Sequence, residues 1–356
     1  MERLNLSLPD GQSYPICMER GLLHHLGDVL SSLTEPCKIM LVTDENVAPL
    51  YLKTAEESLK SAGYTVTHII FPAGEQSKSI QTLGTLLEAM ASARLTRTDL
   101  AVSLGGGIMG DLTGFAAGCY LRGIRFVQVP TTLLSAVDAS VGGKTAVNLV
   151  QGKNLAGLFH QPSAVLCDPD TMKTLSPICI ADGAAEAIKS GIIGDASLFD
   201  MYENDDPLKN LDAVIQKAVA VKARIVAADP TEKGVRKLLN LGHTAGHAIE
   251  IASKFEISHG HAVAIGTAMV TRAASKRELI NSCDSKRILD VLRSNNLPID
   301  CPFSANVLAE IAQTDKKSEN TSITVILPEK IGQCRMEKIE LSGLESLFAD
   351  GLEVHA

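Results

Sequence analysis

Buried strands alternate with helices through the first 130 residues, and this alternation constrains the fold more than any other feature. Apolar and β-branched runs predict strands over residues 38–44, 64–71, 99–104 and 126–130. Helical periodicity over residues 49–62 and 79–93 separates the first three strands. Strands separated by helices favour a parallel sheet with helices on its faces. Ligands of such sheets bind beyond the carboxyl ends of the strands, where Asp44, Glu75 and Lys78 are expected.

A glycine-rich turn follows the third predicted strand. Its spacing, Gly105-x-Gly107-x-x-Gly110, matches the dinucleotide fingerprint, whose glycines let backbone N–H groups approach a pyrophosphate. That fingerprint usually follows the first strand of a fold, and a tight strand-to-helix turn is the alternative interpretation. We predict nucleotide binding without a standard Rossmann topology, followed by a helix over residues 112–120.

Four of the nine histidines fall within 19 residues. His243 and His247 stand at i and i+4, so on a helix they share one face, and His259 and His261 follow about three turns later. Imidazole is a common zinc ligand, and a catalytic metal site needs about three protein ligands and an open position. The cluster predicts a metal site completed by a carboxylate elsewhere in the chain. For any one histidine alone, an ordinary surface or core position is the alternative.

The segment 131–154 is dense in polar residues and glycine. Gly143-Lys144-Thr145 superficially suggests a Walker P-loop, but the required first glycine is replaced by Asp138, which excludes that motif. Lys144 and Lys153, with the neighbouring Asn154, suit a small anion such as a sugar phosphate. A solvated loop with incidental lysines is the alternative.

Composition narrows the class of protein. A chain of 356 residues with 45% apolar residues suits two folded domains, and its net charge of -8 disfavours nonspecific nucleic-acid binding. No apolar run reaches the length of a membrane span, and the first residues do not form a signal peptide. The eight cysteines have no C-x-x-C spacing, which favours reduced thiols and a cytoplasmic location.

Motifs spread over almost the whole chain match one family in order. They include Leu104-Gly-Gly-Gly-Ile-Met-Gly-Asp, Val129-Pro-Thr-Thr, Val137-Asp-Ala-Ser-Val-Gly-Gly-Lys-Thr, Gly152-Lys-Asn, Ala185-Glu-Ala-Ile-Lys189, Asp229-Pro-Thr-Glu-Lys-Gly-Val-Arg236, Leu239-Asn-Leu-Gly-His-Thr-Ala-Gly-His247 and Asp315-Lys-Lys. In these segments the sequence resembles 3-dehydroquinate synthase, a sugar phosphate cyclase. The Asp-x-Ser-Val-Gly-Gly-Lys-Thr form favours the dehydroquinate branch over related cyclases.

The resemblance implies an NAD-binding α/β domain with a parallel sheet over residues 1–176. It implies a mostly α-helical metal- and substrate-binding domain over residues 177–356, with the active site between the two domains. Helical periodicity over residues 212–228, 262–279 and 284–295 agrees with the second domain. The implied reaction converts 3-deoxy-D-arabino-heptulosonate 7-phosphate to 3-dehydroquinate and phosphate, the second step of the shikimate pathway to chorismate and aromatic amino acids. It proceeds by NAD-mediated oxidation, phosphate elimination, reduction and aldol cyclisation.

Site residues follow from the same resemblance. The implied ligands of the metal, zinc or cobalt, are Glu186, His243 and His259, and His247 is implied beside the substrate as a proton-handling group. The implied NAD contacts are Asp44, Gly74, Glu75, Lys78, Gly107, Ile108, Met109, Gly110, Asp111, Thr131, Thr132, Lys144, Lys153 and Thr174. The implied substrate-site residues are Asp138, Lys144, Lys153, Asn154, Lys189, Lys222, Glu232, Arg236, Asn240, His247 and Lys316 or its neighbour Lys317. Arg122 matches a residue that the family contributes from a neighbouring subunit, which implies a homodimer.

The chain departs from the family pattern in three places, one of which is Ser190, where an aromatic residue is common. Ile178 and Cys179 stand where the family usually has a pair of charged residues, and His261 stands where an acidic residue is common. We expect His261 to lie just behind the metal ligands. The rival interpretations are a metal- and NAD-dependent polyol or glycerol dehydrogenase, a cyclase acting on another heptulose phosphate, and a noncatalytic descendant of the fold.

Overall fold

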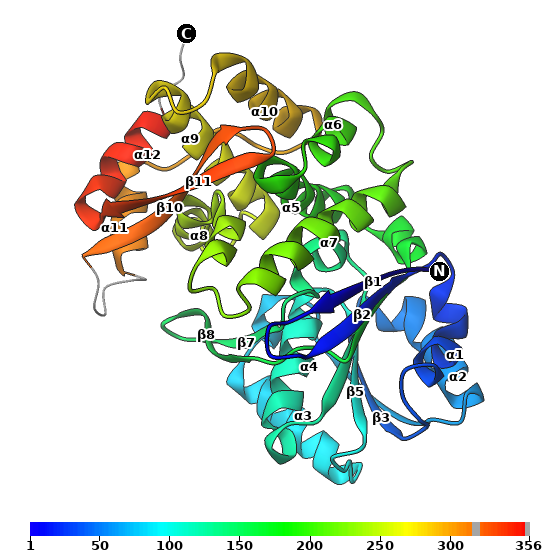
Figure 1. Ribbon diagram of the computed structural model, residues 1–356. Coiled ribbons are helices and arrows are strands. Elements are labelled where there is room, and N and C mark those ends of the chain that lie inside the picture. The colour runs from blue at the N-terminus through cyan, green and yellow to red at the C-terminus, as the bar shows by residue number, and fades with distance from the viewer. Residues whose placement is uncertain (315–320, 353–356) are drawn as a thin grey trace. The chain divides into compact units, whose positions relative to one another are not determined.

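The computed structural model describes residues 1–314 and 321–352. The chain divides into two compact units, Met1–Leu175 and a second unit that begins at Ser176. The first combines a largely parallel sheet with helices, and the second is mostly helical (Figure 1). This confirms the fold class predicted from the sequence.

A seven-stranded sheet organises the first unit. Its strand order is β1-β2-β9-β6-β5-β3-β4, and all neighbours are parallel except the antiparallel pair β1–β2. The strands are β1 (Glu2–Ser7), β2 (Ser13–Met18), β3 (Lys38–Asp44), β4 (Thr65–Phe71), β5 (Leu100–Gly105), β6 (Arg125–Pro130) and β9 (Ala164–Cys167). Because β4 and β5 lie on opposite sides of β3, the chain reverses its direction of strand addition between β3 and β5.

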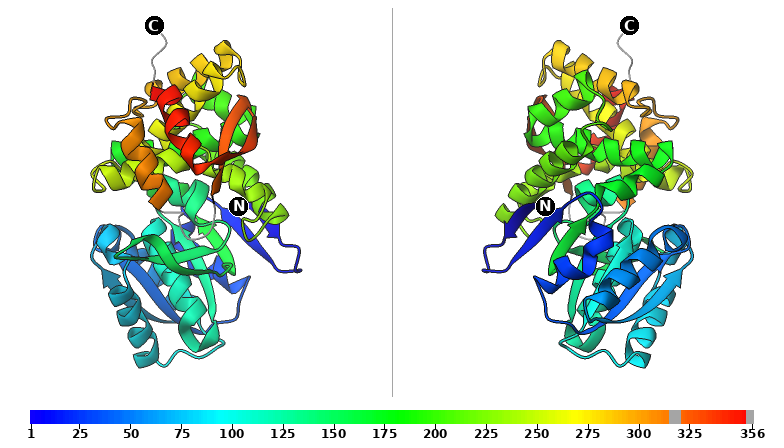
Figure 2. Two further views of the ribbon diagram at one scale, coloured as in Figure 1. Left: turned by 90° about the vertical axis from the view of Figure 1, so that its left-hand side faces the viewer. Right: turned by 90° about the vertical axis from the view of Figure 1, so that its right-hand side faces the viewer.

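Helices cover both faces of this sheet (Figures 1 and 2). They are α1 (Leu26–Ser31), α2 (Lys53–Ser61), α3 (Ile80–Ser92) and α4 (Gly107–Cys119). Alternate residues of β3 serve the two faces: Ile39 and Leu41 pack in the core with α1 and α2, whereas Met40 and Val42 pack with α3 and α4. This period of two places apolar residues on both sides, as a buried parallel strand requires.

Three features of the first unit differ from the sequence-based expectations or were not predicted. The helix expected to start at Leu112 begins at Gly107, so the glycine-rich turn is itself the first helical turn. The strand expected to be the third is the fifth, because the β1–β2 hairpin precedes it. The polar central segment forms an antiparallel hairpin of β7 (Lys144–Leu149) and β8 (Gly152–Phe159).

The second unit packs helices around α9 and adds one hairpin. Its helices are α5 (Pro177–Gly194), α6 (Ala196–Asn204), α7 (Leu211–Ala228), α8 (His243–Ala252), α9 (His259–Lys276), α10 (Ser282–Ser294), α11 (Ala305–Thr314) and α12 (Leu344–Leu352). The antiparallel strands β10 (Ser322–Lys330) and β11 (Gln333–Glu340) form the hairpin. Fourteen of the 18 residues of α9 are buried, which makes it the central helix of the unit.

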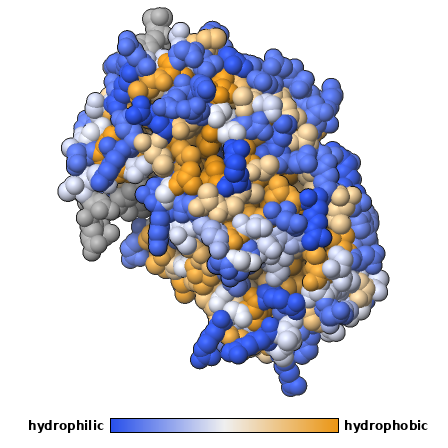
Figure 3. Space-filling view, viewed as in Figure 1, coloured by the Kyte–Doolittle hydropathy of each residue, from blue (hydrophilic) through white to orange (hydrophobic). Residues whose placement is uncertain are grey.

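Polar and apolar residues share the surface. Hydrophilic residues cover much of the face shown in Figure 3, and hydrophobic residues gather in smaller patches on the same face. Among the described residues, no helix combines the length and the apolar character needed to cross a membrane.

Asp99 connects the starts of β3 and β5, and it provides a test of the fold. Its side chain, in a residue that is 5% exposed, accepts hydrogen bonds from Lys38 N at 2.9 Å and from Thr96 N at 2.6 Å. Burial raises the pKa of Asp99, but these hydrogen bonds outweigh burial and lower the pKa below its usual value. The charged carboxylate therefore stabilises the fold above the unfolded-state pKa of about 3.9, and this contribution disappears as the pH falls through the folded-state pKa.

We expect Asp99→Asn to lower the free energy of unfolding by about 1–3 kcal/mol at pH 7. The difference from the wild type should begin to shrink below about pH 4, where the carboxyl of the unfolded wild type takes up a proton before that of the folded protein does, and it should vanish below the folded-state pKa. Urea denaturation at pH 7 and at pH 3 measures this difference in the free energy of unfolding, with the exposed Asp10→Asn as the control. A difference that stays constant down to pH 3 would contradict the role given to the charge.

Candidate active site

The residues expected to hold a nucleotide follow neighbouring parallel strands of the first unit. Asp44 ends β3, the segment 74–78 follows β4, the glycine-rich turn follows β5, and Thr131 and Thr132 follow β6. The strand order places Asp44 and the glycine-rich turn at the point where strand addition reverses, which is the usual ligand crevice of an open α/β sheet.

Close packing explains why this turn needs glycines. A Cβ atom added at Gly105 would lie 2.9 Å from Met109 Cβ and 3.5 Å from Asp44 Oδ2. A Cβ atom at Gly110 would lie 2.4 Å from Gln128 Oε1. These glycines are therefore required by packing within the first unit. No side chain caps the N-terminus of α4. Helix N-termini of this kind are suited to phosphate groups.

Charged residues beside the turn are already paired. Lys78 is 7% exposed, and its Nζ lies 2.5 Å from Asp111 Oδ2 in the first turns of α4. Glu75 Oε1 accepts a hydrogen bond from Asn148 Nδ2 at 2.7 Å and lies 3.7 Å from Lys153 Nζ. These contacts connect the segment after β4 to α4 and to the β7–β8 hairpin.

The remaining predicted residues of the first unit have different surroundings. Asn154 has a positive φ of 58°, and its N–H donates to Asn148 Oδ1. Lys144 is exposed at the start of β7, and Asp138 lies in the short π-helix Ser135–Ala139. Thr174 Oγ1 lies 2.7 Å from the Tyr51 hydroxyl. Arg122 follows the far end of α4, about 20 Å along the helix from the glycine-rich turn.

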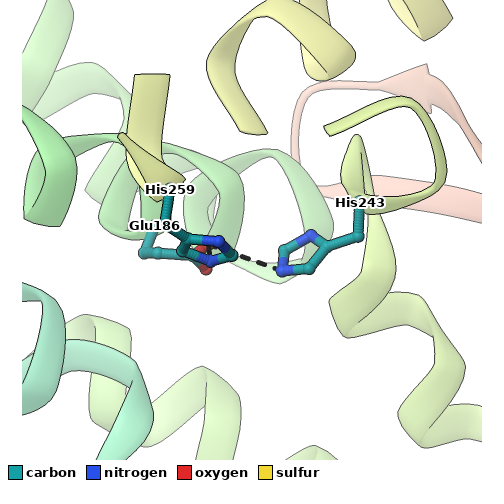
Figure 4. A group of neighbouring side chains, drawn as sticks. All are labelled: Glu186, His243 and His259. Atoms are coloured by element: carbon teal, nitrogen blue, oxygen red, sulfur yellow. Dashed lines mark ion pairs between the residues drawn. The ribbon is translucent and has the colours of Figure 1, made fainter. Parts of the chain in front are cut away.

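The second unit brings the three expected metal ligands together. Glu186 comes from α5, and His243 and His259 are the first residues of α8 and α9. Figure 4 shows the three side chains converging from their three helices. Glu186 Oε1 lies 3.6 Å from His243 Nε2 and 3.5 Å from His259 Nε2. Ligand atoms around a tetrahedral zinc ion are separated by about 3.3–3.4 Å, so this donor set fits such a cation.

Both histidines are oriented through their other ring nitrogen. His243 Nδ1 lies 3.1 Å from the carbonyl oxygen of Leu241, and His259 Nδ1 lies 3.3 Å from Glu250 Oε2. A hydrogen bond from Nδ1–H to each of these oxygens leaves Nε2 as the ring nitrogen that faces Glu186. Metal-binding histidines are commonly fixed in this way.

The site contains charged side chains that are removed from water. Glu186 is fully buried, and its carboxylate contacts the Lys189 ammonium on the same helix, which is 2% exposed. Burial raises the pKa of Glu186, but Lys189 and the two histidines outweigh burial and lower it well below its usual range. Burial and the Lys189 charge lower the pKa of His243. Burial also lowers the pKa of His259, but Glu186 and Glu250 outweigh it and raise the pKa to about 10.

Glycines let the helices that carry the histidines approach closely. Gly242 precedes His243 with a positive φ of 76°, and a Cβ atom there would lie 2.7 Å from Val263 O on α9. A Cβ atom at Gly266 would lie 2.1 Å from Gly242 O. The short, glycine-rich spacing around the histidines thus reflects backbone-to-backbone packing of α8 on α9.

Other expected residues of the second unit lie on neighbouring elements. His247 is exposed one turn after His243, and their ring centroids are 5.3 Å apart. Lys222 on α7 is 6% exposed, and Arg236 in the 3-10 helix Val235–Asn240 is 1% exposed. Asn240 Nδ2 donates to Glu232 Oε1 at 2.6 Å. Lys316 and Lys317 lie outside the described residues.

Two acidic residues beside the expected ligands were not identified from the sequence. Glu250, 3% exposed, stands three residues after His247, and this His-x-x-Glu spacing on one helix was the available signal. With His247 and His259 it forms a second group of potential ligands. Because His259 directs Nδ1 toward Glu250, we interpret Glu250 as an orienting residue. Asp182 lies 3.0 Å from His261 Nδ1, so His261 pairs with an acid four residues before Glu186.

The pair of Glu186 and Lys189 generates a prediction about the metal-free protein. Glu186→Gln should lower the free energy of unfolding by about 3–5 kcal/mol, because it leaves the buried Lys189 ammonium without the carboxylate it contacts. The double variant Glu186→Met with Lys189→Met should recover most of this loss, since an apolar pair needs no charge compensation. Chemical denaturation in the presence of chelator measures both. Equal stability of wild type and Glu186→Gln would contradict this account.

Known proteins resemble this chain over nearly its whole length. Two family models match it, 3-dehydroquinate synthase N-terminal over residues 68–181 and 3-dehydroquinate synthase C-terminal over residues 183–318. A 3-dehydroquinate synthase of Clostridium acetobutylicum is 40% identical over 346 residues, which cover 96% of this chain and 97% of that protein.

Solved structures share the fold of this chain. The 2-epi-5-epi-valiolone synthase ValA of Streptomyces hygroscopicus subsp. jinggangensis, with NAD+ and Zn2+ bound, is 27% identical with a TM-score of 0.87, covering 98% of this chain and 99% of that one. A 2-deoxy-scyllo-inosose synthase in complex with carbaglucose-6-phosphate, NAD+ and Co2+ has the same fold, with a TM-score of 0.85 at 24% identity, covering 99% of this chain and all of that one. The two family models and the 40% identity show that the chain belongs to the 3-dehydroquinate synthase family.

Proposed function

We propose that this protein is a 3-dehydroquinate synthase, which converts 3-deoxy-D-arabino-heptulosonate 7-phosphate to 3-dehydroquinate and phosphate. The observation that carries the proposal is the buried Glu186 carboxylate facing two histidine Nε2 atoms, in a chain 40% identical to a 3-dehydroquinate synthase. Membership of the family places the reaction in the route to aromatic amino acids.

We propose that the two units divide the cofactors between them. The expected NAD contacts that follow strands β3 to β6, together with Lys144, Lys153 and Thr174, would hold NAD in the first unit. Glu186, His243 and His259 would hold one divalent metal, zinc or cobalt, in the second unit. Support for NAD comes from the glycine-rich turn, which lies where strand addition reverses and leads into the uncapped N-terminus of α4. Support for the metal comes from the donor set and its spacing.

When bound, the metal supplies a Lewis acid for substrate hydroxyls, and NAD supplies a hydride acceptor that the reaction regenerates. The protein's own cations would bind the substrate's phosphate and carboxylate. The buried Lys189, Lys222 and Arg236 suit this role, since a desolvated cation attracts an anion more strongly than an exposed one. The exposed His247, beside His243, would move protons to and from the bound substrate. The proposed substrate site is completed by Asp138, Lys144, Lys153, Asn154, Glu232, Asn240 and Lys316.

A phosphate-release assay with the heptulosonate phosphate tests this function. We expect phosphate release by the NAD- and zinc-loaded protein without net NADH, loss of activity with chelator, and recovery when zinc or cobalt is added. His259→Ala should reduce turnover by at least about a hundredfold, because it removes a ligand, whereas the exposed His68→Ala should not change it. Steady NADH production from polyols without phosphate release would favour the dehydrogenase alternative. Phosphate release from another heptulose phosphate alone would favour the second cyclase alternative.

We also propose that the protein forms a homodimer in the cytoplasm. The β7–β8 hairpin exposes the apolar side chains Leu149, Val150, Leu155 and Phe159. The hairpin packs on α4, and α4 ends shortly before Arg122, the residue expected to act across subunits. Exposed apolar patches of this kind are typical of subunit interfaces. All eight cysteines are free thiols, as suits a reducing compartment.

Sedimentation equilibrium at micromolar concentration tests the dimer. We expect a mass of two chains for the wild type and a shift toward monomer for Phe159→Glu, which places a charge in the proposed interface. Ile178→Glu, at an exposed apolar residue in the second unit, is the control and should remain dimeric. A wild-type mass of one chain would contradict the proposal.

A further inference from the structure

Asp182 on α5 holds the first turn of α9, the turn that begins with His259. Its Oδ1 atom accepts a hydrogen bond from Ser258 Oγ at 2.6 Å, from His261 N at 3.2 Å and from His261 Nδ1 at 3.0 Å. Ser258 Oγ also lies 2.8 Å from His261 Nδ1. The two residues that flank His259 and Gly260 are thus tied to one carboxylate oxygen.

This contact replaces an ordinary helix cap. Ser258 is the N-cap residue of α9, but its side chain does not cap the helix and donates to Asp182. The N–H of the third helical residue, His261, which a local cap would satisfy, is bonded to Asp182 on another helix. The Asp182 charge also lies where the dipole of an 18-residue helix favours an anion.

Backbone packing at Gly260 is a second, independent observation at this place. A Cβ atom added at Gly260 would lie 2.3 Å from Asp182 Cα and 2.5 Å from Asp182 O. The backbones of α5 and α9 therefore touch where the hydrogen bonds join them, and no side chain separates the two helices there.

The contact lies one turn from the metal ligand on α5. Asp182 and Glu186 are at i and i+4, so they share one face of the helix. Along the chain, His259 lies between Ser258 and His261, the two residues that Asp182 holds. We propose that Asp182, Ser258 and His261 form an interhelical lock that sets the spacing between Glu186 and His259, and that they are positioning residues for the metal. This inference rests on the metal site of the proposed function.

Cobalt binding tests the lock without relying on turnover. The dissociation constant for Co2+ is measured by chelator competition, and the visible absorption band of bound cobalt reports the coordination geometry. We expect Asp182→Ala to weaken binding by about 10–100-fold and to change the band, as loss of a group that orients a ligand does. Asp182→Asn, which keeps one acceptor oxygen, should restore part of the affinity. Ser258→Ala should weaken binding by about three- to tenfold.

Asp195→Ala is the matched control. Asp195 caps α6 by accepting from Ser197 and Leu198 and follows the far end of α5, about 13 Å along the helix from Glu186. It should lower thermal stability and leave cobalt binding unchanged. If Asp182→Ala does not fold, Asp182→Asn and Ser258→Ala decide the question.

Unchanged affinity and an unchanged cobalt band in folded Asp182 and Ser258 variants would overturn the lock while leaving the metal site intact. Wild-type protein that binds no cobalt, or cobalt binding that survives Glu186→Gln, would instead overturn the metal site and the lock with it. The two failures are therefore distinguishable.

Discussion

The second unit is built around a carboxylate that is completely removed from water. Burying the Glu186 charge is costly unless opposite charge lies beside it, and Lys189 and two imidazoles meet that requirement. A well-packed apolar group would serve stability as well or better. The arrangement is therefore best explained by a function that needs a buried anionic ligand next to two imidazole nitrogens, namely holding a divalent cation.

Three helices must be held at fixed separations for this arrangement to exist. Glycines at 242, 260 and 266 allow direct backbone contact at the crossings of α9 with α8 and α5. The two histidines proposed as ligands are the first residues of their helices, where neighbouring groups can fix their side chains. Leu241 O and Glu250 fix the rings, and Asp182 holds the turn that carries His259. Residues outside the proposed ligand set thus fix the spacing of Glu186, His243 and His259.

Periodicity and spacing predicted much of this protein. The alternation of strands and helices gave the fold class, and the histidine cluster indicated a metal site with a missing carboxylate. Spacing alone could not identify Glu186, because its nearness to the histidines is a tertiary contact; the family resemblance supplied it. The start of α4 at Gly107 was missed because glycines disfavour helices in isolation and are tolerated here by packing. Asp182 was missed because a cap supplied by another helix leaves no local signal, and Lys316 lies outside the described residues.

X-ray diffraction at the zinc absorption edge, from crystals of the zinc-loaded protein, tests the central claim most directly. The account predicts one strong anomalous peak about 2.0–2.2 Å from a Glu186 oxygen and from Nε2 of both His243 and His259. A peak among His247, Glu250 and His259, or no ordered zinc near Glu186, would contradict it.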